Sequence, residues 1–178
     1  MCPGNNREVK KHRDELTGEH TFGDAGQLII AVCFLVVWVL DSFVLKYTTY
    51  LNDYIPLAVQ ITLGVIILVV AVYMARTGMN IVFNEVRETP GVIRKGLFGV
   101  VRHPIYISEM LLYLGLLFIR TSLAAAAIWI IAIGFLHYLS KYEEKLLLER
   151  FGDDYRKYMK DVPMYLPRLR RRKEKASI

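Results

Sequence analysis

The chain has 178 residues, of which 54% are hydrophobic and 22% are charged, and its formal net charge is +6 at pH 7. This length predicts a single domain, and the apolar share exceeds the usual range of water-soluble proteins. Its two cysteines, Cys2 and Cys33, form no spacing pattern, which argues against a disulfide framework or a metal site.

The apolar residues are concentrated in long runs. The first two runs are each about the 20 residues that a helix needs to cross a bilayer core. A third run is too long for one crossing and is broken at Arg120-Thr121-Ser122, so we expect two short spans that form a tight or tilted hairpin. The sequence therefore predicts an all-α integral membrane protein with about four transmembrane helices, at 27–47, 55–75, 105–119 and 123–140.

The positive charges are distributed unevenly among the connections. Of the 23 Lys and Arg residues, 21 lie in three segments, with four in 1–26, five in 76–104 and twelve in 141–178. Because such segments stay in the cytoplasm, we expect a multi-pass protein with both termini cytoplasmic. The basic tail from Arg168 to Lys173 is expected to meet anionic lipid headgroups, and nucleic acid is not expected as a partner.

The first half of the chain contains one acid inside a predicted span. Asp41 lies about two-thirds of the way across the first span, far from the other polar positions, and we expect a structural hydrogen bond for it. The polar segment 1–26 does not have the layout of a cleaved signal peptide and is expected to be irregular or briefly amphipathic. The short linker 48–54 is expected at the outer interface.

The second span is expected to end at Arg76, which leaves 77–104 as the one long internal connection. Loops of this length are usually functional or disordered. This one combines turn residues with regularly placed apolar residues, so we expect ordered backbone on the membrane face. Beyond 140 the last span is expected to continue as a helix, to end at Gly152, and to be followed by a short helix near 153–160.

Arg102-His103-Pro104 precedes an apolar run and predicts a helix start. Pro104 suits the first turn, with His103 near the N-cap. The N–H groups of such a turn can receive an anion, and a histidine can donate or accept a proton near neutral pH. The alternative is that His103 and Arg102 are interfacial residues at a helix end.

Glu143 and Glu144 lie one to two turns beyond the last predicted span. Adjacent helical residues point about 100° apart, so at most one of the pair is expected to face a site. The alternative is a solvated acidic pair stabilised by Lys141 and Lys145. Two further polar residues inside predicted spans, Glu109 and His137, are candidates by their position.

Four elements in order resemble the isoprenylcysteine carboxyl methyltransferase family: RHPIY at 102–106, EEKLL at 143–147, FGDDYRKY at 151–158, and two prolines at 163 and 167. The related membrane phospholipid N-methyltransferases are similar. The resemblance covers about residues 85–168. It implies one S-adenosylmethionine-dependent methyltransferase domain over 1–178, with a cytoplasmic segment 1–26, two spans in 27–75, a catalytic region with the cytoplasmic cofactor-binding loop in 76–168, and a basic tail 169–178.

The resemblance also implies the site residues. The S-adenosyl-L-methionine pocket would be formed by the loop, the helix start and the first acid, namely Pro90, Gly91, Val92, Ile93, Phe98, His103, Pro104, Ile105, Tyr106 and Glu143. The acceptor would be a lipid or another lipophilic molecule that enters from the bilayer. If this acceptor is an amine, His103 or Glu109 could take its proton, so we name His103, Glu109 and Glu143 as catalytic candidates and expect no metal.

Departures from the family pattern leave the acceptor open. Phe98 stands where family members usually have Tyr, and the His that they carry near Pro90 is missing. Leu139 replaces an Arg that faces the substrate carboxylate in the isoprenylcysteine enzymes. The acceptor could therefore be a prenylcysteine, a phosphatidylethanolamine-type phospholipid or a small thiol.

Two alternatives to a methyltransferase remain at this stage. Sterol reductases share an RHPxY-like element and the acid three residues after Tyr106, here Glu109, and would bind NADPH. A membrane scaffold without catalytic activity would use the same polar stretches only to seal helix ends.

Overall fold

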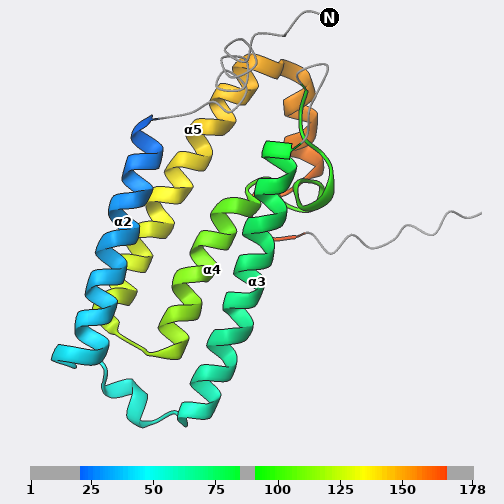
Figure 1. Cartoon of the computed structure of the whole chain (residues 1–178). Helices are drawn as coiled ribbons and strands as arrows, with labels where there is room; N and C mark the ends of the chain where they lie inside the picture. The colour runs from blue at the N-terminus through cyan, green and yellow to red at the C-terminus, as the bar shows by residue number, and fades with distance from the viewer. Residues whose placement is uncertain (1–20, 85–90, 168–178) are drawn as a thin grey trace, which may run out of the picture.

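The computed structural model describes residues 21–84 and 91–167. Four apolar helices form the body of the molecule (Figure 1): α2 (Thr21–Val39), α3 (Leu57–Asn84), α4 (Pro104–Ile119) and α5 (Leu123–Asp161). A π-helical turn η1 (Leu40–Leu45) and two 3₁₀ turns, η2 (Tyr50–Asp53) and η3 (Gly96–Gly99), complete the regular elements of the described residues. The all-α prediction is confirmed.

Three of these helices are long and apolar enough to cross a membrane, over Gly23–Leu45, Leu57–Val82 and Leu123–Asp161. The fourth, α4, is apolar but has 16 residues and a length of about 24 Å, shorter than a bilayer core of about 30 Å. Large apolar side chains such as Val69 and Ile130 are about two-thirds exposed, as expected for surfaces that lie against lipid tails. The protein is an integral membrane protein.

The helices pack as two antiparallel pairs, α2 on α5 and α3 on α4 (Figure 1). Gly64 of α3 and Gly115 of α4 meet where the second pair crosses. A Cβ atom at Gly64 would lie 2.8 Å from the Gly115 carbonyl oxygen, so the two backbones approach closely only because both residues lack a side chain. This contact fixes α4 beside the longer α3.

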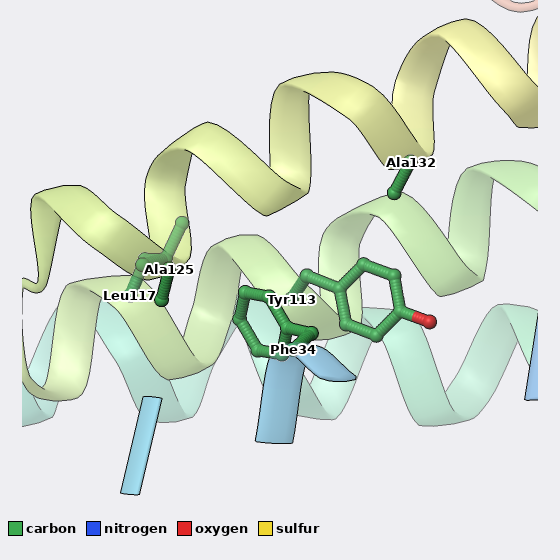
Figure 2. Packing of buried hydrophobic residues seen from close by; sticks show 5 residues of the cluster. All are labelled: Phe34, Tyr113, Leu117, Ala125 and Ala132. Carbon is green, nitrogen blue, oxygen red and sulfur yellow. The ribbon is translucent and has the colours of Figure 1, made fainter. Parts of the chain in front are cut away.

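A compact apolar cluster joins the two pairs in the middle of the bundle (Figure 2). The Phe34 ring of α2 lies 4.6 Å from the Tyr113 ring of α4, measured between centroids. Leu117 of α4 and two alanines of α5, Ala125 and Ala132, complete the buried set. The small α5 residues let the other helices approach, and the cluster fixes the relative positions of α2, α4 and α5.

Polar contacts close the bundle at the end opposite the long connection. Asp41 accepts hydrogen bonds from the Thr48 side chain, from the Thr48 amide at 3.2 Å and from the Ser122 hydroxyl at 2.6 Å. The Trp38 indole donates to the Arg120 carbonyl oxygen at 3.0 Å. Asp41 therefore ties the end of α2 to the α4–α5 turn, and the predicted structural hydrogen bond is confirmed.

Two predicted helix ends are wrong. The helix of the second span continues past Arg76 to Asn84, and α2 begins at Thr21, before the predicted start of the first span at residue 27 and inside the segment expected to be irregular or briefly amphipathic. Hydropathy predicts where a helix leaves the bilayer. The helix itself can extend further, because its backbone hydrogen bonds continue for as long as the following residues favour helical structure. The predicted stop at Gly152 is confirmed, because this residue has φ 54° and separates the last helical segment from the rest of α5.

Candidate functional site

The segment before α4 is held in place by the C-terminal part of the chain. The Tyr158 hydroxyl donates to the Phe98 carbonyl oxygen at 2.6 Å, and the Arg94 guanidinium donates to the Asp154 carbonyl oxygen at 2.8 Å. Val92 packs against a buried cluster that contains Tyr155 and Tyr158. The described part of the connection before α4 is therefore packed on the last helical segment, and its expected position on the membrane face stays a prediction.

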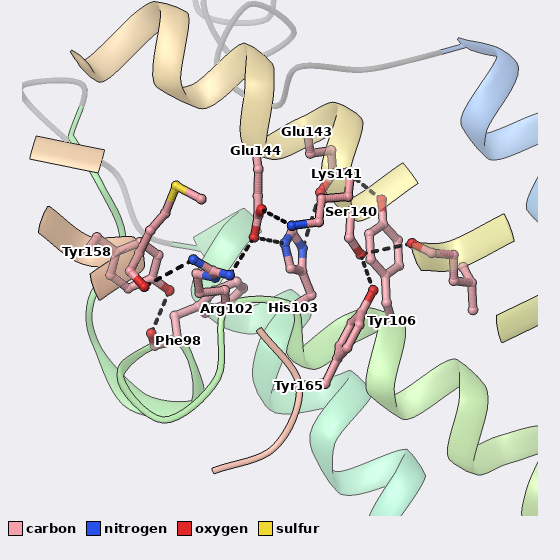
Figure 3. Close-up of polar contacts among 12 residues, drawn as sticks. Phe98, Arg102, His103, Tyr106, Ser140, Lys141, Glu143, Glu144, Tyr158 and Tyr165 are labelled. Atoms are coloured by element: carbon pink, nitrogen blue, oxygen red, sulfur yellow. Dashed lines mark hydrogen bonds and ion pairs between the residues drawn. The ribbon is translucent and has the colours of Figure 1, made fainter. Parts of the chain in front are cut away.

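His103 lies at the start of α4 between two carboxylates. It is 6% exposed, with Nδ1 3.5 Å from Glu143 Oε2 and Nε2 3.3 Å from Glu144 Oε1. The Tyr106 hydroxyl donates to Glu143 Oε1, and its ring stacks on His103 with the centroids 5.6 Å apart. Three residues from two predicted motifs, His103, Tyr106 and Glu143, thus form one cluster (Figure 3).

Both acids of the pair reach His103, so the expectation that at most one would face a site is wrong. The imidazole presents one nitrogen to each side, and two long carboxylate side chains can converge on it from adjacent helical positions. Their environments differ, since Glu143 is 35% exposed and Glu144 only 3%. Glu144 also pairs with Arg102, with Nη2 3.0 Å from Oε1.

The electrostatics of this cluster favour a protonated His103. Burial by itself lowers the pKa of the imidazole. The hydrogen bonds and negative charges of Glu143 and Glu144 outweigh burial, and the net effect raises the pKa of His103 above its ordinary value of 6.5. The His103 cation can therefore neutralise part of the charge of the two carboxylates.

The first turn of α4 keeps two backbone donors open. Pro104 has no N–H, the His103 amide donates to the Met164 carbonyl oxygen at 3.4 Å, and the His103 side chain makes no capping bond. Within the described part of the chain, the amides of Ile105 and Tyr106 have no acceptor. These two N–H groups can therefore receive an anion, with the helix dipole adding to the attraction.

Other predicted site residues are placed differently. The Ile105 side chain packs against α3 beside Gly78. Gly91 borders open space, with no atom within 4 Å of an added Cβ, and Ile93 is half-buried. Pro90 lies outside the described residues.

Among the described residues, no hydrogen bond or ion pair joins Glu109 to the cluster around His103. Its carboxylate accepts a hydrogen bond from the Tyr113 hydroxyl at 2.7 Å, one turn deeper along α4. Glu109 is three positions after Tyr106, so the two share one face of the helix. His137 lies with its ring 5.9 Å from that of Tyr165.

The sequence reasoning missed several contributors. Arg102 and Glu144 form a buried ion pair beside His103. The only indication of this pair in the sequence is that each residue stands next to a predicted site residue, His103 or Glu143, in its motif. Tyr165 and Ser140 had no signal, because their contact joins the C-terminal segment to α5 over 25 positions. Among the described residues no group of three or more His, Cys, Asp and Glu could hold a metal ion.

Comparison with known proteins places the chain in a family. The sequence profile described as phospholipid methyltransferase matches residues 56–154, which is more than half of the chain. The matched range contains the His103, Tyr106 and Glu143 cluster and the loop before it. No curated protein matches the chain. The chain belongs to the phospholipid methyltransferase family, within the group of membrane methyltransferases that also includes the isoprenylcysteine enzymes.

Proposed function

We propose that the protein transfers a methyl group from S-adenosylmethionine to the amine headgroup of a membrane lipid. The observation that carries this proposal is the convergence of His103, Tyr106 and Glu143 beside the open first turn of α4. These side chains come from the start of α4 and from α5 beyond 140, next to the apolar body of the bundle. A lipid headgroup and a water-soluble donor can both reach such a position.

The residues at the helix start fit the cofactor by their chemistry. The Ile105 and Tyr106 amides suit its carboxylate, and Glu143 suits its cationic end. The space beside Gly91 leaves room for a flat group against the loop backbone. When bound, S-adenosylmethionine supplies an electrophilic methyl group on a positively charged sulfur.

The charge of the surroundings favours an amine over a carboxylate as acceptor. Glu143 is part of the cluster, the negative charge of Asp24 on α2 acts on the Tyr106 hydroxyl, and Glu109 lies on the same face of α4 as Tyr106. Of the neighbouring cations, Arg102 is already bound to Glu144, and the protonated His103 is shared between Glu143 and Glu144. An ammonium headgroup would be attracted to these walls, and a carboxylate would be repelled.

An amine must lose a proton before it can attack a methyl group. Glu143 is placed to accept this proton, because its carboxylate faces both Tyr106 and His103 and is partly open to water. His103 and Tyr106 hold the carboxylate in position. The rest of the work is to orient donor and acceptor in line, which a rigid cluster on two helices can do.

Methylation of a prenylcysteine carboxylate is less well supported. It would require a cation facing the acceptor, and the family's Arg position is occupied by Leu139, which is buried. Recruiting Arg102 instead would leave Glu144 without its closest cationic partner in the interior of the protein.

The purified protein, incubated with methyl-labelled S-adenosylmethionine, tests this proposal. Micelles containing phosphatidylethanolamine should yield labelled lipid, and N-acetyl-farnesylcysteine should yield little or none. Label found mainly in the prenylcysteine would show that the acceptor group is a carboxylate and not an amine. A protein that labels neither acceptor would contradict the proposal.

A further inference from the structure

The segment after α5 crosses the start of α4. The amides of Arg102 and His103 donate to the carbonyl oxygens of Pro163 and Met164 at 3.0 and 3.4 Å. Val162 is buried in the cluster of Tyr155 and Tyr158. This C-terminal strap, residues 162–167, is therefore fixed to the helix start and to the last helical segment.

Tyr165 of the strap reaches into the site between two histidines. Its ring centroid lies 6.2 Å from that of His103 and 5.9 Å from that of His137. Its hydroxyl donates to Ser140 Oγ at 2.8 Å, and Ser140, which is fully buried, donates to the Leu136 carbonyl oxygen at 2.9 Å. Figure 3 shows the Tyr165 ring on the side of His103 away from Glu144, pointing towards Ser140.

The Tyr165 ring lies beside His103 and reaches the facing helix α5. Ser140 is a small residue where α5 faces the strap, and it accepts the bond from the Tyr165 hydroxyl while the ring lies 6.2 Å from that of His103. A tyrosine held at its hydroxyl has little freedom to move aside. The Tyr165 ring therefore forms a rigid wall of the site, which limits the space beside Glu143 and His103.

We propose that Tyr165 is a specificity-determining residue that limits the size of the acceptor headgroup, and therefore how many methyl groups its nitrogen can already carry. This inference rests on the proposed function. A nitrogen placed at Glu143 and His103 must fit beside the Tyr165 ring. Each methyl group already present enlarges the headgroup, and one such group changes discrimination by about 10–200-fold in a confined site.

The test uses three acceptors of increasing size: phosphatidylethanolamine, its N-methyl derivative and its N,N-dimethyl derivative, each in mixed micelles with labelled S-adenosylmethionine. The readout is the ratio of kcat/KM for the dimethyl lipid to that for the unmethylated lipid. Tyr165→Ala should raise this ratio about tenfold. Because it compares two substrates of the same preparation, a lower yield of folded protein does not change it.

Milder variants test the hydrogen bond between the Tyr165 and Ser140 hydroxyls. Tyr165→Phe and Ser140→Ala each remove the bond between the two side chains while the wall stays in place. Each should raise the ratio by less than Tyr165→Ala, and the double variant should add nothing to either single variant. Tyr165→Leu narrows the wall without emptying it and serves if the alanine variant does not fold.

A matched control is Tyr138→Ala, which removes a tyrosine that is 64% exposed on α5, two residues from Ser140. This variant should keep the wild-type ratio. An active enzyme whose ratio is the same in the wild type, Tyr165→Ala and Tyr165→Leu would overturn the role of Tyr165 alone. A wild-type protein that methylates none of the three lipids would overturn the proposed function, and this inference with it.

Discussion

His103 is the residue on which the site depends most, because it touches both acids and stacks on Tyr106. Its raised pKa links its charge to stability. A group with a raised folded-state pKa stabilises the fold fully below its unfolded pKa of about 6.5, and this contribution is lost as the pH rises through the folded-state value.

The thermal stability of the detergent-solubilised protein should therefore fall as the pH rises above about 6.5 through the pKa of folded His103. His103→Gln should lose this part of the pH dependence, because glutamine does not titrate. The measurement is a set of melting curves across this pH range. A His103→Gln profile identical to wild type would contradict the assignment.

Glu144 has a structural task that differs from that of Glu143. It is buried and pairs with Arg102, so Glu144→Gln leaves a largely buried guanidinium without its counter-charge. We expect this variant to lose about 3–5 kcal/mol of stability. Glu143→Gln, at the more exposed position, should stay folded. Denaturant titration of both variants distinguishes these roles, and equal stability of the two would argue against them.

At the scale of elements, the α3–α4 contact is the one most sensitive to added volume. A Cβ at Gly64 would meet backbone atoms of α4 at 2.8 and 3.0 Å, and backbone cannot move aside as a side chain can. Gly64→Ala should therefore destabilise the protein by about 1–3 kcal/mol.

Gly134→Ala provides the control for that substitution. No atom lies within 4 Å of a Cβ added at Gly134 in α5, so the change should be neutral or stabilise the protein by up to about 1 kcal/mol. Unfolding in mixed micelles compares the two variants. Similar effects of both would show that the close approach of α3 and α4 is not required.

The contacts of Asp41 hold together the end of the bundle that lies far from the site. Asp41→Ala leaves the Ser122 and Thr48 donors without their acceptor, and we expect a loss of about 1–3 kcal/mol. Methyl transfer per folded molecule should be unchanged, since Asp41 contacts the turn after the end of α4, whereas His103 lies at the start of that helix. A parallel measurement of melting temperature and specific activity tests both statements.

At the scale of the whole molecule, the sequence predicts the four apolar helices, the turn at 120–122 and the break at Gly152, and all are observed. It also predicts that His103 and Glu143, 40 positions apart, lie together, because their motifs flank one helical hairpin. These features follow from the lengths of the apolar runs and from local turn chemistry. The cytoplasmic placement of the two termini stays a prediction from the charge distribution.

Other features could not be derived from the sequence. The extent of α3 beyond Arg76 depends on backbone hydrogen bonds, which hydropathy does not report. The Arg102–Glu144 pair and the contact of Tyr165 with Ser140 depend on how segments that are distant in the chain pack together. Neither motif spacing nor periodicity contains that information.

Binding of S-adenosylmethionine to the purified protein tests the central claim most directly. Calorimetry in detergent should show saturable binding to the wild type and much weaker binding to Glu143→Gln, because Glu143 lies beside the helix start that would hold the donor. NADPH should not bind. Absence of S-adenosylmethionine binding to a folded wild-type protein, or preferential binding of NADPH as in a reductase, would contradict the account.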